Sequence, residues 1–571
     1  MLNTLKKYWG FDSFRPKQEE IIASALEGKD TLGILPTGGG KSVCFQVPAI
    51  MKKGICIVVT PLIALIKDQV ESLNKRGIPA LSVHSAMTYR EIDVTLDNAV
   101  YGEYKFLYVS PERLRTRIFQ TRVQMMDVNY LVVDEAHCIC QWGYDFRPDY
   151  LKIKEIRELL HGSEFGDKVP VIALTATATA EVAEDIMCQL EFSVKNILVS
   201  GFERPNLSYV VRKAENKLGQ LLSICNSVPG TGIVYVGTRK KAEEIASMLQ
   251  SQGVDASAYH AGMNSAVRAA IQQEWKDGKK RIIVSTNAFG MGIDKPDVRF
   301  VCHYDIPSSP ESYFQEAGRA GRDGKRAYAV LLWNSSDLSR LTRLNNTTYP
   351  ELETVREIYQ KVFYYLDIPY EEGAGKSFKF RVEDFARQYG INSTVAYYAI
   401  KYIETSGYWS LTEELQIPSR MKMLLNRDEL YEVQLNSEDI DTFLKLLMRQ
   451  YPGIFSGYVT INEDDLARVG HYSILSVEAK LKKLSAMQVL HYVPKTKSPI
   501  LNLNNERLYD NNLKLPQQTY DFLKGRSQKR IDAMTEYAKE TDTCRSQVLL
   551  SYFGQPSKPC GCCDICKKRN K

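Results

Sequence analysis

Short apolar runs rich in β-branched residues recur along the first 340 residues and alternate with amphipathic stretches. Such runs are typical of strands that are buried on both faces of a parallel sheet. The pattern stops near residue 200 and then restarts, which predicts two α/β lobes in tandem with a boundary near Arg204–Pro205. The runs are GICIVV (54–59), KFLYVS (105–110), YLVVDE (130–135), VPVIAL (169–174), GIVYVG (232–237), RIIVST (281–286), FVCHYD (300–305) and YAVLLW (328–333).

The composition is that of an ordinary globular protein. A chain of 571 residues is too long for one hydrophobic core, so several domains are expected. The net charge of +6, from 74 basic and 68 acidic residues, is too small an excess to indicate a nucleic-acid-binding protein by itself. The N-terminus lacks the apolar region of a secretory leader, and no apolar run is long enough to cross a membrane. We therefore expect a cytoplasmic chain without a membrane partner.

One segment is rich in glycine. Pro36-Thr37-Gly38-Gly39-Gly40-Lys41-Ser42 follows an apolar stretch and precedes VCFQVPAI, which can open a helix. Glycine lets backbone N–H groups turn inward around phosphate oxygens, because no Cβ stands in the way. Lys41 brings positive charge to the β- and γ-phosphates of ATP, and Ser42 can ligate Mg²⁺. Leu35 stands where the general pattern has an earlier glycine, and a glycine-rich turn with a chance lysine is the alternative interpretation.

Two adjacent carboxylates end the run YLVVD. Asp134 and Glu135 begin the motif Asp134-Glu135-Ala136-His137, about ninety residues after the glycine-rich segment. Nucleotides bind at the carboxyl ends of strands in parallel sheets. We expect Asp134 to hold Mg²⁺ through water and Glu135 to polarise the attacking water.

The second lobe carries two arginines three positions apart, Arg319 and Arg322, within the segment 315–322. They would share one face of a helix or project from one loop. Either arrangement can offer positive charge to a transferring phosphoryl group. A solvated basic surface is the alternative, but the surrounding pattern favours a site that both lobes complete.

Together these segments resemble the RecQ family of superfamily 2 DNA helicases, from about residue 8 to 340 and again from about 525 to 566. The segment Gly10-Phe11-Asp12-Ser13-Phe14-Arg15-Pro16-Lys17-Gln18 is similar to the adenine-reading motif of that family. The resemblance implies that Arg15 and Gln18 contact the base, and it adds Gln315 to the nucleotide-binding residues. A glutamine side chain can pair with adenine and an arginine can stack on it.

The resemblance also implies contacts with DNA. Thr60-Pro61-Leu62-Ile63-Ala64-Leu65 and Ser110–Leu114 resemble strand-gripping motifs, and Thr175–Ala178 resembles the motif that links hydrolysis to DNA. Thr286–Asp294 completes the set in the second lobe. Hydroxyls such as those of Thr60 and Thr286 would hold the phosphodiester chain, which carries no sequence information.

The segment that follows His137 is similar to the aromatic-rich loop of the family: Cys138-Ile139-Cys140-Gln141-Trp142-Gly143-Tyr144-Asp145-Phe146-Arg147-Pro148. Trp142 and Phe146 offer ring faces on which unpaired bases can stack. Arg147 can add a phosphate or cation–π contact. A buried aromatic cluster is the alternative, although the glycine and proline favour an exposed loop.

Five of the 12 cysteines crowd the last 28 residues. Cys544, Cys560, Cys563 and Cys566 have the spacing C-x15-C-x2-C-x2-C, which fits a closed structural Zn²⁺ site. Cys562 is interpreted as a bystander. The segment resembles the RecQ zinc module, and an iron–sulfur cluster is the competing interpretation.

About 185 residues separate the second lobe from this module, which departs from the usual RecQ order. Residues 382–386 and 393–400 predict two helices across a turn, and 407–411 predicts a following strand, as in a helix-turn-helix with a wing. A second such unit is predicted over 463–503, with a hairpin between 489–494 and 500–503. We expect this insert to bind duplex DNA, and a packing or partner-binding domain is the alternative.

The predicted fold class is α/β, with two tandem RecA-like (P-loop) parallel-sheet lobes, a mixed α+β winged-helix-like region and a small helical zinc module. The predicted domains are 1–205, 206–340, 341–525 and 526–571 in that order.

The resemblance implies an ATP- and Mg²⁺-dependent DNA helicase, with Zn²⁺ in a structural site, that moves 3′ to 5′ on single-stranded DNA and unwinds duplex DNA in recombination or repair. Single-stranded and forked DNA are the expected partners of a monomer, with single-strand-binding or recombination proteins as candidates. An RNA helicase of the same superfamily and an ATP-gated DNA-remodelling protein remain alternatives.

Overall fold

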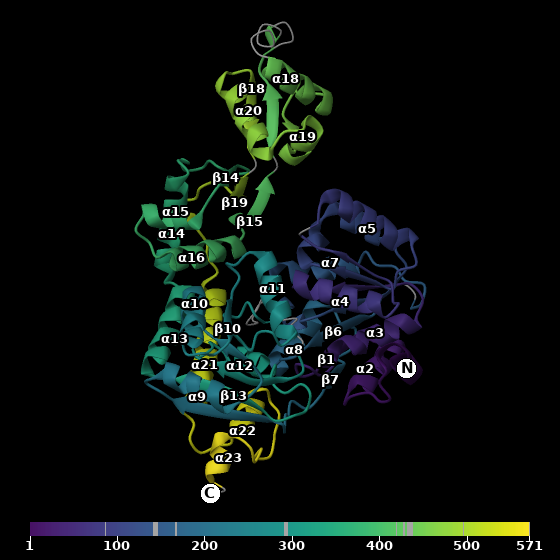
Figure 1. The fold of residues 1–571 in the computed structure, drawn as a ribbon, viewed down its shortest axis with the longest axis vertical. Helices are drawn as coiled ribbons and strands as arrows, with labels where there is room; N and C mark the ends of the chain where they lie inside the picture. Colours follow the sequence, from purple (N-terminus) through teal and green to yellow (C-terminus); the bar gives the residue numbers. More distant parts are fainter. Residues whose placement is uncertain are drawn as a thin grey trace. The chain divides into compact units, whose positions relative to one another are not determined.

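The computed structural model describes residues 1–85, 87–140, 147–165, 168–290, 295–417, 419–425, 429–430, 438–494 and 496–569. The chain forms two compact units (Figure 1). One unit combines Met1–Arg343 with Gly525–Lys571, and the other is Leu344–Lys524. The second unit is therefore inserted between two segments of the first. In the described part of the chain, no helix is long and apolar enough to cross a membrane.

The first lobe is built on a seven-stranded parallel sheet. Alternate strand residues point to opposite faces, so that Cys56 and Val58 pack in one core layer and Ile57 and Val59 in the other. Helices α2 (Gln18–Leu26), α3 (Lys41–Met51) and α4 (Ile63–Lys75) cover the first face, and α5 (Tyr89–Tyr101), α6 (Arg117–Val123), α7 (Lys152–Arg157) and α8 (Ala180–Gln189) cover the second. The strand order is β3 (Ala80–Val83), β4 (Phe106–Val109), β2 (Ile55–Val59), β5 (Val128–Val133), β6 (Val171–Thr175), β1 (Thr31–Ile34) and β7 (Ile197–Val199).

The second lobe repeats this plan with a six-stranded parallel sheet. Helices α9 (Lys217–Ser227) and α10 (Arg239–Ser251) cover one face, and α11 (Ser265–Lys276) and α12 (Pro310–Ala317) cover the other. The strand order is β10 (Ala256–Tyr259), β11 (Ile282–Ser285), β9 (Thr231–Tyr235), β12 (Val298–His303), β13 (Ala327–Trp333) and β8 (Leu207–Lys213).

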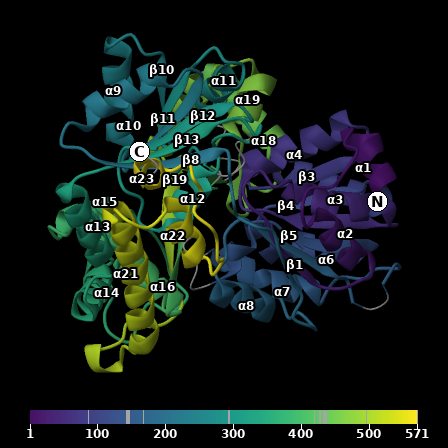
Figure 2. The same cartoon turned by 90° about the horizontal axis from the view of Figure 1, so that it is seen from below.

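The C-terminal segment returns to the second lobe. Helices α22 (Arg545–Tyr552) and α23 (Asp564–Arg569) follow α21 (Gln517–Lys539) and pack against β8, and α22 also packs against α12 (Figure 2). The backbone N–H of Val211 donates to Asp564 Oδ2 over 3.0 Å, and Arg530 pairs with Glu311 over 3.2 Å. Residues more than 200 positions apart in sequence thus share one core. The predicted fold class is confirmed.

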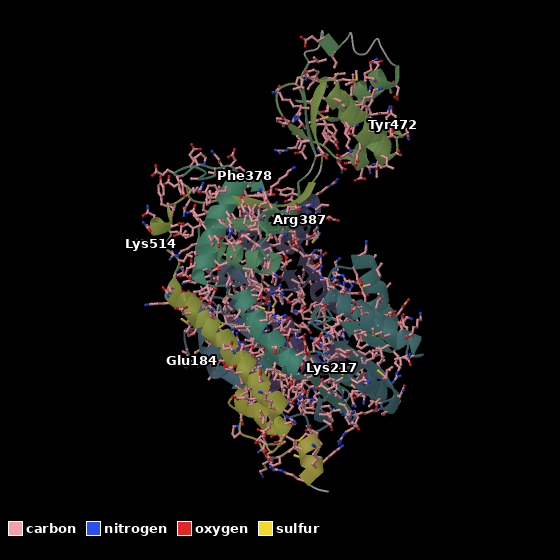
Figure 3. The ribbon with its side chains drawn as sticks, turned by 90° about the vertical axis from the view of Figure 1, so that its left-hand side faces the viewer. Glu184, Lys217, Phe378, Arg387, Tyr472 and Lys514 are labelled. Carbon is pink, nitrogen blue, oxygen red and sulfur yellow. The ribbon has the colours of Figure 1, made fainter. Side chains whose placement is uncertain are left out.

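The inserted unit contains two antiparallel three-stranded sheets, each packed on its own helices. Phe378 and Arg387 belong to the first body and Tyr472 to the second (Figure 3). The first body comprises α14 (Leu352–Tyr365), β14 (Ser377–Lys379), α15 (Val382–Gln388), α16 (Ser393–Thr405), β15 (Trp409–Ile417) and β19 (Thr496–Leu503). The second comprises β16 (Arg420–Met423), α18 (Glu438–Gln450), β17 (Val459–Thr460), α19 (Glu463–Gly470), α20 (Ile474–Ala486) and β18 (Leu490–Val493).

The predicted helix pair and following strand correspond to α15, α16 and β15. The predicted hairpin between 489–494 and 500–503 is wrong. Strand β18 pairs with β16, whereas β19 pairs with β14 and β15. The second body is therefore nested between β15 and β19 of the first. Strands β18 and β19 were predicted from their apolar residues, but each pairs with strands that lie roughly 70 to 125 positions earlier in the sequence.

Candidate ATP site and zinc centre

The glycine-rich segment connects β1 to the first residue of α3. Gly38 and Gly40 adopt left-handed backbone conformations with φ of 77° and 76°. A Cβ on Gly40 would lie 2.4 Å from Nε2 of Gln18, so this side chain would have to move, and the left-handed backbone itself disfavours a larger residue. The first N–H groups of an α-helix lack i−4 partners and carry partial positive charge, so the start of α3 directly after this turn favours anion binding.

Lys41, the first residue of α3, is paired with a carboxylate at the end of the neighbouring β5. Its Nζ lies 3.1 Å from Glu135 Oε1, and both side chains are largely buried. The adjacent Asp134 accepts a hydrogen bond from the Thr60 hydroxyl over 3.4 Å, and its other oxygen accepts from the N–H of Glu135. The strand ends predicted to face the nucleotide thus bring Lys41, Asp134 and Glu135 together.

The two carboxylates differ in their electrostatic surroundings. Burial raises the pKa of Asp134 to about 6, and the neighbouring Glu135 adds to this effect. Burial also acts to raise the pKa of Glu135, but the positive charges of Lys41 and Arg319 and the neighbouring His137 outweigh it, so that this pKa is lowered. Glu135 is therefore the carboxylate that is held ionised by its neighbours.

The second lobe contributes a loop that follows α12. Arg319 in this loop is only 3% exposed and lies close enough to Glu135 to lower its pKa. The Arg322 side chain lies 3.1 Å from where a Cβ on Gly38 would stand, and the Thr37 hydroxyl lies closer still, 2.1 Å from where a Cβ on Gly318 would stand. The glycine-rich segment 36–42, the candidate phosphate-binding segment, is thus in direct contact with this loop, residues 318–326, which we call the arginine loop.

Three further nucleotide-binding candidates lie around this loop and the glycine-rich segment. Gln315 is buried on α12. Nε2 of Gln18 donates to the carbonyls of Gly39 and Gly40 over 3.1 and 3.0 Å, and Arg15 donates to the Gly38 carbonyl. The structure places both side chains against the backbone of the glycine-rich segment, and the prediction that they contact adenine stays a prediction.

The predicted DNA-binding residues are only partly described. Trp142 and Phe146 lie outside the described residues, as does 291–294 in the second-lobe motif. Arg147 donates to the Pro61 carbonyl over 3.1 Å, which joins the end of the predicted aromatic loop to a strand-gripping motif. The Thr286 hydroxyl accepts from the N–H of Ala288 over 3.4 Å.

Two hydrogen bonds near the end of β5 were not predicted. Nδ1 of His137 lies 3.0 Å from the Thr175 hydroxyl, and the Tyr150 hydroxyl donates to the Asp134 carbonyl over 3.0 Å. Neither has a local sequence signal, although both partners lie in or next to the quoted motifs. His137 and Tyr150 lie on either side of 141–146 in the sequence. They are hydrogen-bonded to Thr175 at the end of β6 and to Asp134 directly after β5.

Four cysteine sulfurs converge in the C-terminal segment. The Sγ atoms of Cys544, Cys560, Cys563 and Cys566 all lie within 4.8 Å of one another. Four thiolates around a tetrahedral zinc ion are separated by about 3.8 Å, so this set fits Zn²⁺ closely. The backbone N–H groups of Cys560, Cys563 and Cys566 donate to sulfurs of this set over 3.2 to 3.4 Å, which orients the ligands. Cys562 is not one of these four: its thiol donates to the carbonyls of Pro205 and Leu207, and it also interacts with the neighbouring Cys560.

Four known protein families match parts of the two lobes, the inserted unit and the C-terminal cysteine-rich segment. The DEAD/DEAH box helicase family matches residues 15–186, and the helicase conserved C-terminal domain matches 213–324. The RecQ helicase winged-helix domain of Bacteroidota matches 421–494, which is the second body of the inserted unit. The RecQ zinc-binding family matches 505–567, including all four clustered cysteines.

Comparison with individual proteins agrees. The chain is 44% identical over 336 residues to the ATP-dependent DNA helicase RecQ of Bacillus subtilis and 41% identical over 344 residues to that of Haemophilus influenzae. These alignments cover 58% and 60% of this chain but only 56% and 55% of those relatives. The chain is also 38% identical over 401 residues to the probable ATP-dependent DNA helicase RecS of Bacillus subtilis, covering 69% of this chain and 77% of that protein. The chain belongs to the RecQ family of helicases.

Proposed function

We propose that this chain is an ATP- and Mg²⁺-dependent DNA helicase that moves 3′ to 5′ along single-stranded DNA and separates duplex DNA in recombination or repair. The observation that carries the proposal is the meeting of Lys41 and Glu135 from one lobe with Arg319 from the other. The relatives named DNA helicases support DNA as the substrate.

Lys41 and Arg319 supply the positive charge that a transferring phosphoryl group requires. When ATP binds, its phosphates compete with Glu135 for Lys41 Nζ, and this competition releases the carboxylate to orient and polarise the attacking water. Arg319 then stabilises the charge that develops on the transferring group. Because Arg319 comes from the second lobe, hydrolysis depends on how the two lobes meet.

Mg²⁺ fits the residues at this site. Asp134 is a buried carboxylate whose described hydrogen bonds come from Thr60 and the N–H of Glu135, and oxygen ligands of this kind suit a hard cation. Asp134 and Ser42 would hold the ion, which would neutralise charge on the phosphates.

DNA binding can reach the ATP site through hydrogen-bonded neighbours of the catalytic strand. His137 contacts Thr175, and Arg147 contacts Pro61, so the segment between them joins the catalytic motif to two motifs that resemble DNA-contacting ones. A base that stacks on this segment would shift His137, which lies two residues after Glu135 in the chain. We infer that DNA stimulates hydrolysis by this route.

The zinc-binding segment serves as a structural support. All four ligand positions are cysteines, so a bound zinc has no open position for catalysis. The segment packs on β8 and α12, and α12 leads into the arginine loop. The inserted unit is the candidate duplex-binding element, because its first body has the helix-turn-helix with a wing and its second matches a winged-helix family.

Lys41→Ala should reduce ATP turnover by at least about 100-fold and abolish strand displacement, because it removes the positive charge that Lys41 brings to the phosphates. The measurement is displacement of a labelled strand from 3′-tailed and 5′-tailed duplexes, with DNA affinity measured separately. We expect unwinding of the 3′-tailed duplex only, and nearly unchanged DNA affinity in the variant.

Lys52→Ala is the matched control, because Lys52 immediately follows the other end of α3 and pairs with Glu164. Full turnover by Lys41→Ala would refute the assigned site. ATP hydrolysis without strand displacement would favour a remodelling protein, and stronger stimulation by single-stranded RNA than by DNA would favour an RNA helicase.

Cys544→Ser should lower the metal content from about one zinc ion per chain to near zero, whereas Cys562→Ser should keep it. The reason is that Cys544 belongs to the sulfur cluster while Cys562 bonds to carbonyls of the lobe boundary. Metal analysis of the purified variants checks this. Equal zinc loss in both variants, or iron with visible absorbance in the parent chain, would contradict the assignment.

Deleting 345–520 should weaken binding to forked duplex DNA by at least about tenfold, equivalent to about 1.4 kcal/mol, while ATP hydrolysis stimulated by single-stranded DNA is retained. A smaller deletion replaces 418–495 with a two-residue turn, which is feasible because Ile417 pairs directly with Thr496. Comparing the two deletions by DNA titration identifies the responsible body. Unchanged forked-duplex affinity in the larger deletion would overturn the proposal.

A further inference from the structure

The linker between the lobes holds the loop that carries the catalytic arginines. Arg204 lies between β7 and β8, and its guanidinium donates to three carbonyls of this loop. The distances are 3.2 Å to Gly318, 2.7 Å to Ala320 and 3.0 Å to Gly321. These carbonyls surround Arg319 on both sides, so Arg204 fixes the backbone from which the Arg319 side chain projects.

Asn206 holds the same loop at its far end. Its Nδ2 donates to the carbonyls of Gly321 and Lys325 over 2.6 and 2.9 Å. Gly321 has a φ of 63°, and a Cβ there would lie 2.6 Å from this Nδ2. The close approach leaves the loop little freedom to shift along the linker.

These hydrogen bonds also provide partners for the backbone carbonyls at and just after the C-terminal end of α12. The last carbonyls of α12 and of the turn after it lack partners within the helix, and they carry partial negative charge. The guanidinium of Arg204 pairs with carbonyls at this end and has the planar donors to hold more than one of them. On the opposite side, Gly318 lies against Thr37 of the phosphate-binding segment. The loop is thus held between the linker and the ATP site.

The zinc-binding segment forms hydrogen bonds with the linker on both sides of Arg204. On one side, the Gln555 side chain accepts a hydrogen bond from the N–H of Phe202 over 3.0 Å. On the other side, the Cys562 thiol donates to the Leu207 carbonyl over 3.6 Å. The Phe202 ring packs against Phe314 of α12 and Phe553 of α22, with centroids 5.7 and 5.6 Å away.

We propose that Arg204 and Asn206 are positioning residues for ATP hydrolysis, which hold Arg319 toward Glu135 and through which the zinc-binding segment acts on the ATP site. The inference rests on the proposed hydrolysis of ATP and deepens it. It assigns to the zinc-binding segment a definite task, which is to fix the linker that fixes the arginine loop. The described hydrogen bonds of Arg204 and Asn206 all go to the arginine loop, so we expect their effect on hydrolysis to pass through this loop.

Arg204→Met tests the proposal, because it keeps the aliphatic stem and removes the donors. We expect kcat for ATP to fall by about 10- to 100-fold, since displacement of a catalytic group by about 1 Å has effects of this size. The KM for ATP should stay within about twofold, because the phosphate-binding segment is intact. Adding Arg204→Met to Arg319→Ala should cost little more, since the loop then has no Arg319 to position.

Arg299→Met is the matched control. Arg299 also anchors the arginine loop, but near its far end, through Asp323 and the Arg326 carbonyl, and its described hydrogen bonds reach none of the carbonyls from 318 to 321. Its kcat should remain near that of the parent chain. Asn206→Ala provides a second variant, with an expected kcat loss of about 3- to 10-fold from its two hydrogen bonds. It keeps the test decisive if Arg204→Met does not fold.

The possible results distinguish a failure of the positioning role from a failure of the proposed ATPase activity. Parent-like kcat in Arg204→Met, together with an inactive Lys41→Ala, overturns the positioning role and leaves the ATPase assignment intact. Losses that multiply in the Arg204→Met, Arg319→Ala double variant, or that come with lost zinc and a lower unfolding midpoint, also overturn it. Normal turnover in Lys41→Ala overturns the proposed ATPase itself.

Discussion

The ion pair between Lys41 and Glu135 is the interaction on which the rest of the site depends. It joins the start of α3 to the end of β5, so the phosphate-binding segment and the catalytic strand are held at one edge of the sheet. Both groups are largely buried, and a buried charge is tolerated only with a partner. ATP phosphates are the natural replacement for Glu135 as the partner of Lys41, and this exchange would prepare the carboxylate for its task.

The positive charge that completes this pair comes from a loop with its own support. Arg319 lowers the pKa of Glu135 from the second lobe, and Arg204 and Asn206 hold the carbonyls beside it. The zinc-binding segment in turn holds the linker, although more than 340 residues separate Phe202 from Gln555 in the sequence. The segment that carries the four clustered cysteines is thereby connected, through the linker and the arginine loop, to the candidate ATP site of the first lobe.

Much of this could be predicted because the signals are local. The spacing of glycines before Lys41, the carboxylates ending a strand and the cysteine spacing each fix a short piece of backbone or a metal geometry. Partners distant in sequence could not be predicted: β19 pairs with β15 rather than with the neighbouring β18. The linker was recognised only as a boundary, because Arg204 acts on backbone carbonyls that leave no trace in residue types. The roles of Arg15, Gln18 and Thr286 stay predictions.

The central claim is that the ATP site is divided between the two lobes. Single-turnover ATP hydrolysis by Arg319→Ala, with nucleotide affinity measured on the same protein, tests it most directly. If Arg319 acts on the transferring phosphoryl group, the rate of the chemical step should fall by about 10³-fold or more while ATP binds nearly as before. Exposed Arg326, seven residues further on, supplies the control Arg326→Ala. An unchanged rate of hydrolysis in Arg319→Ala would contradict the account.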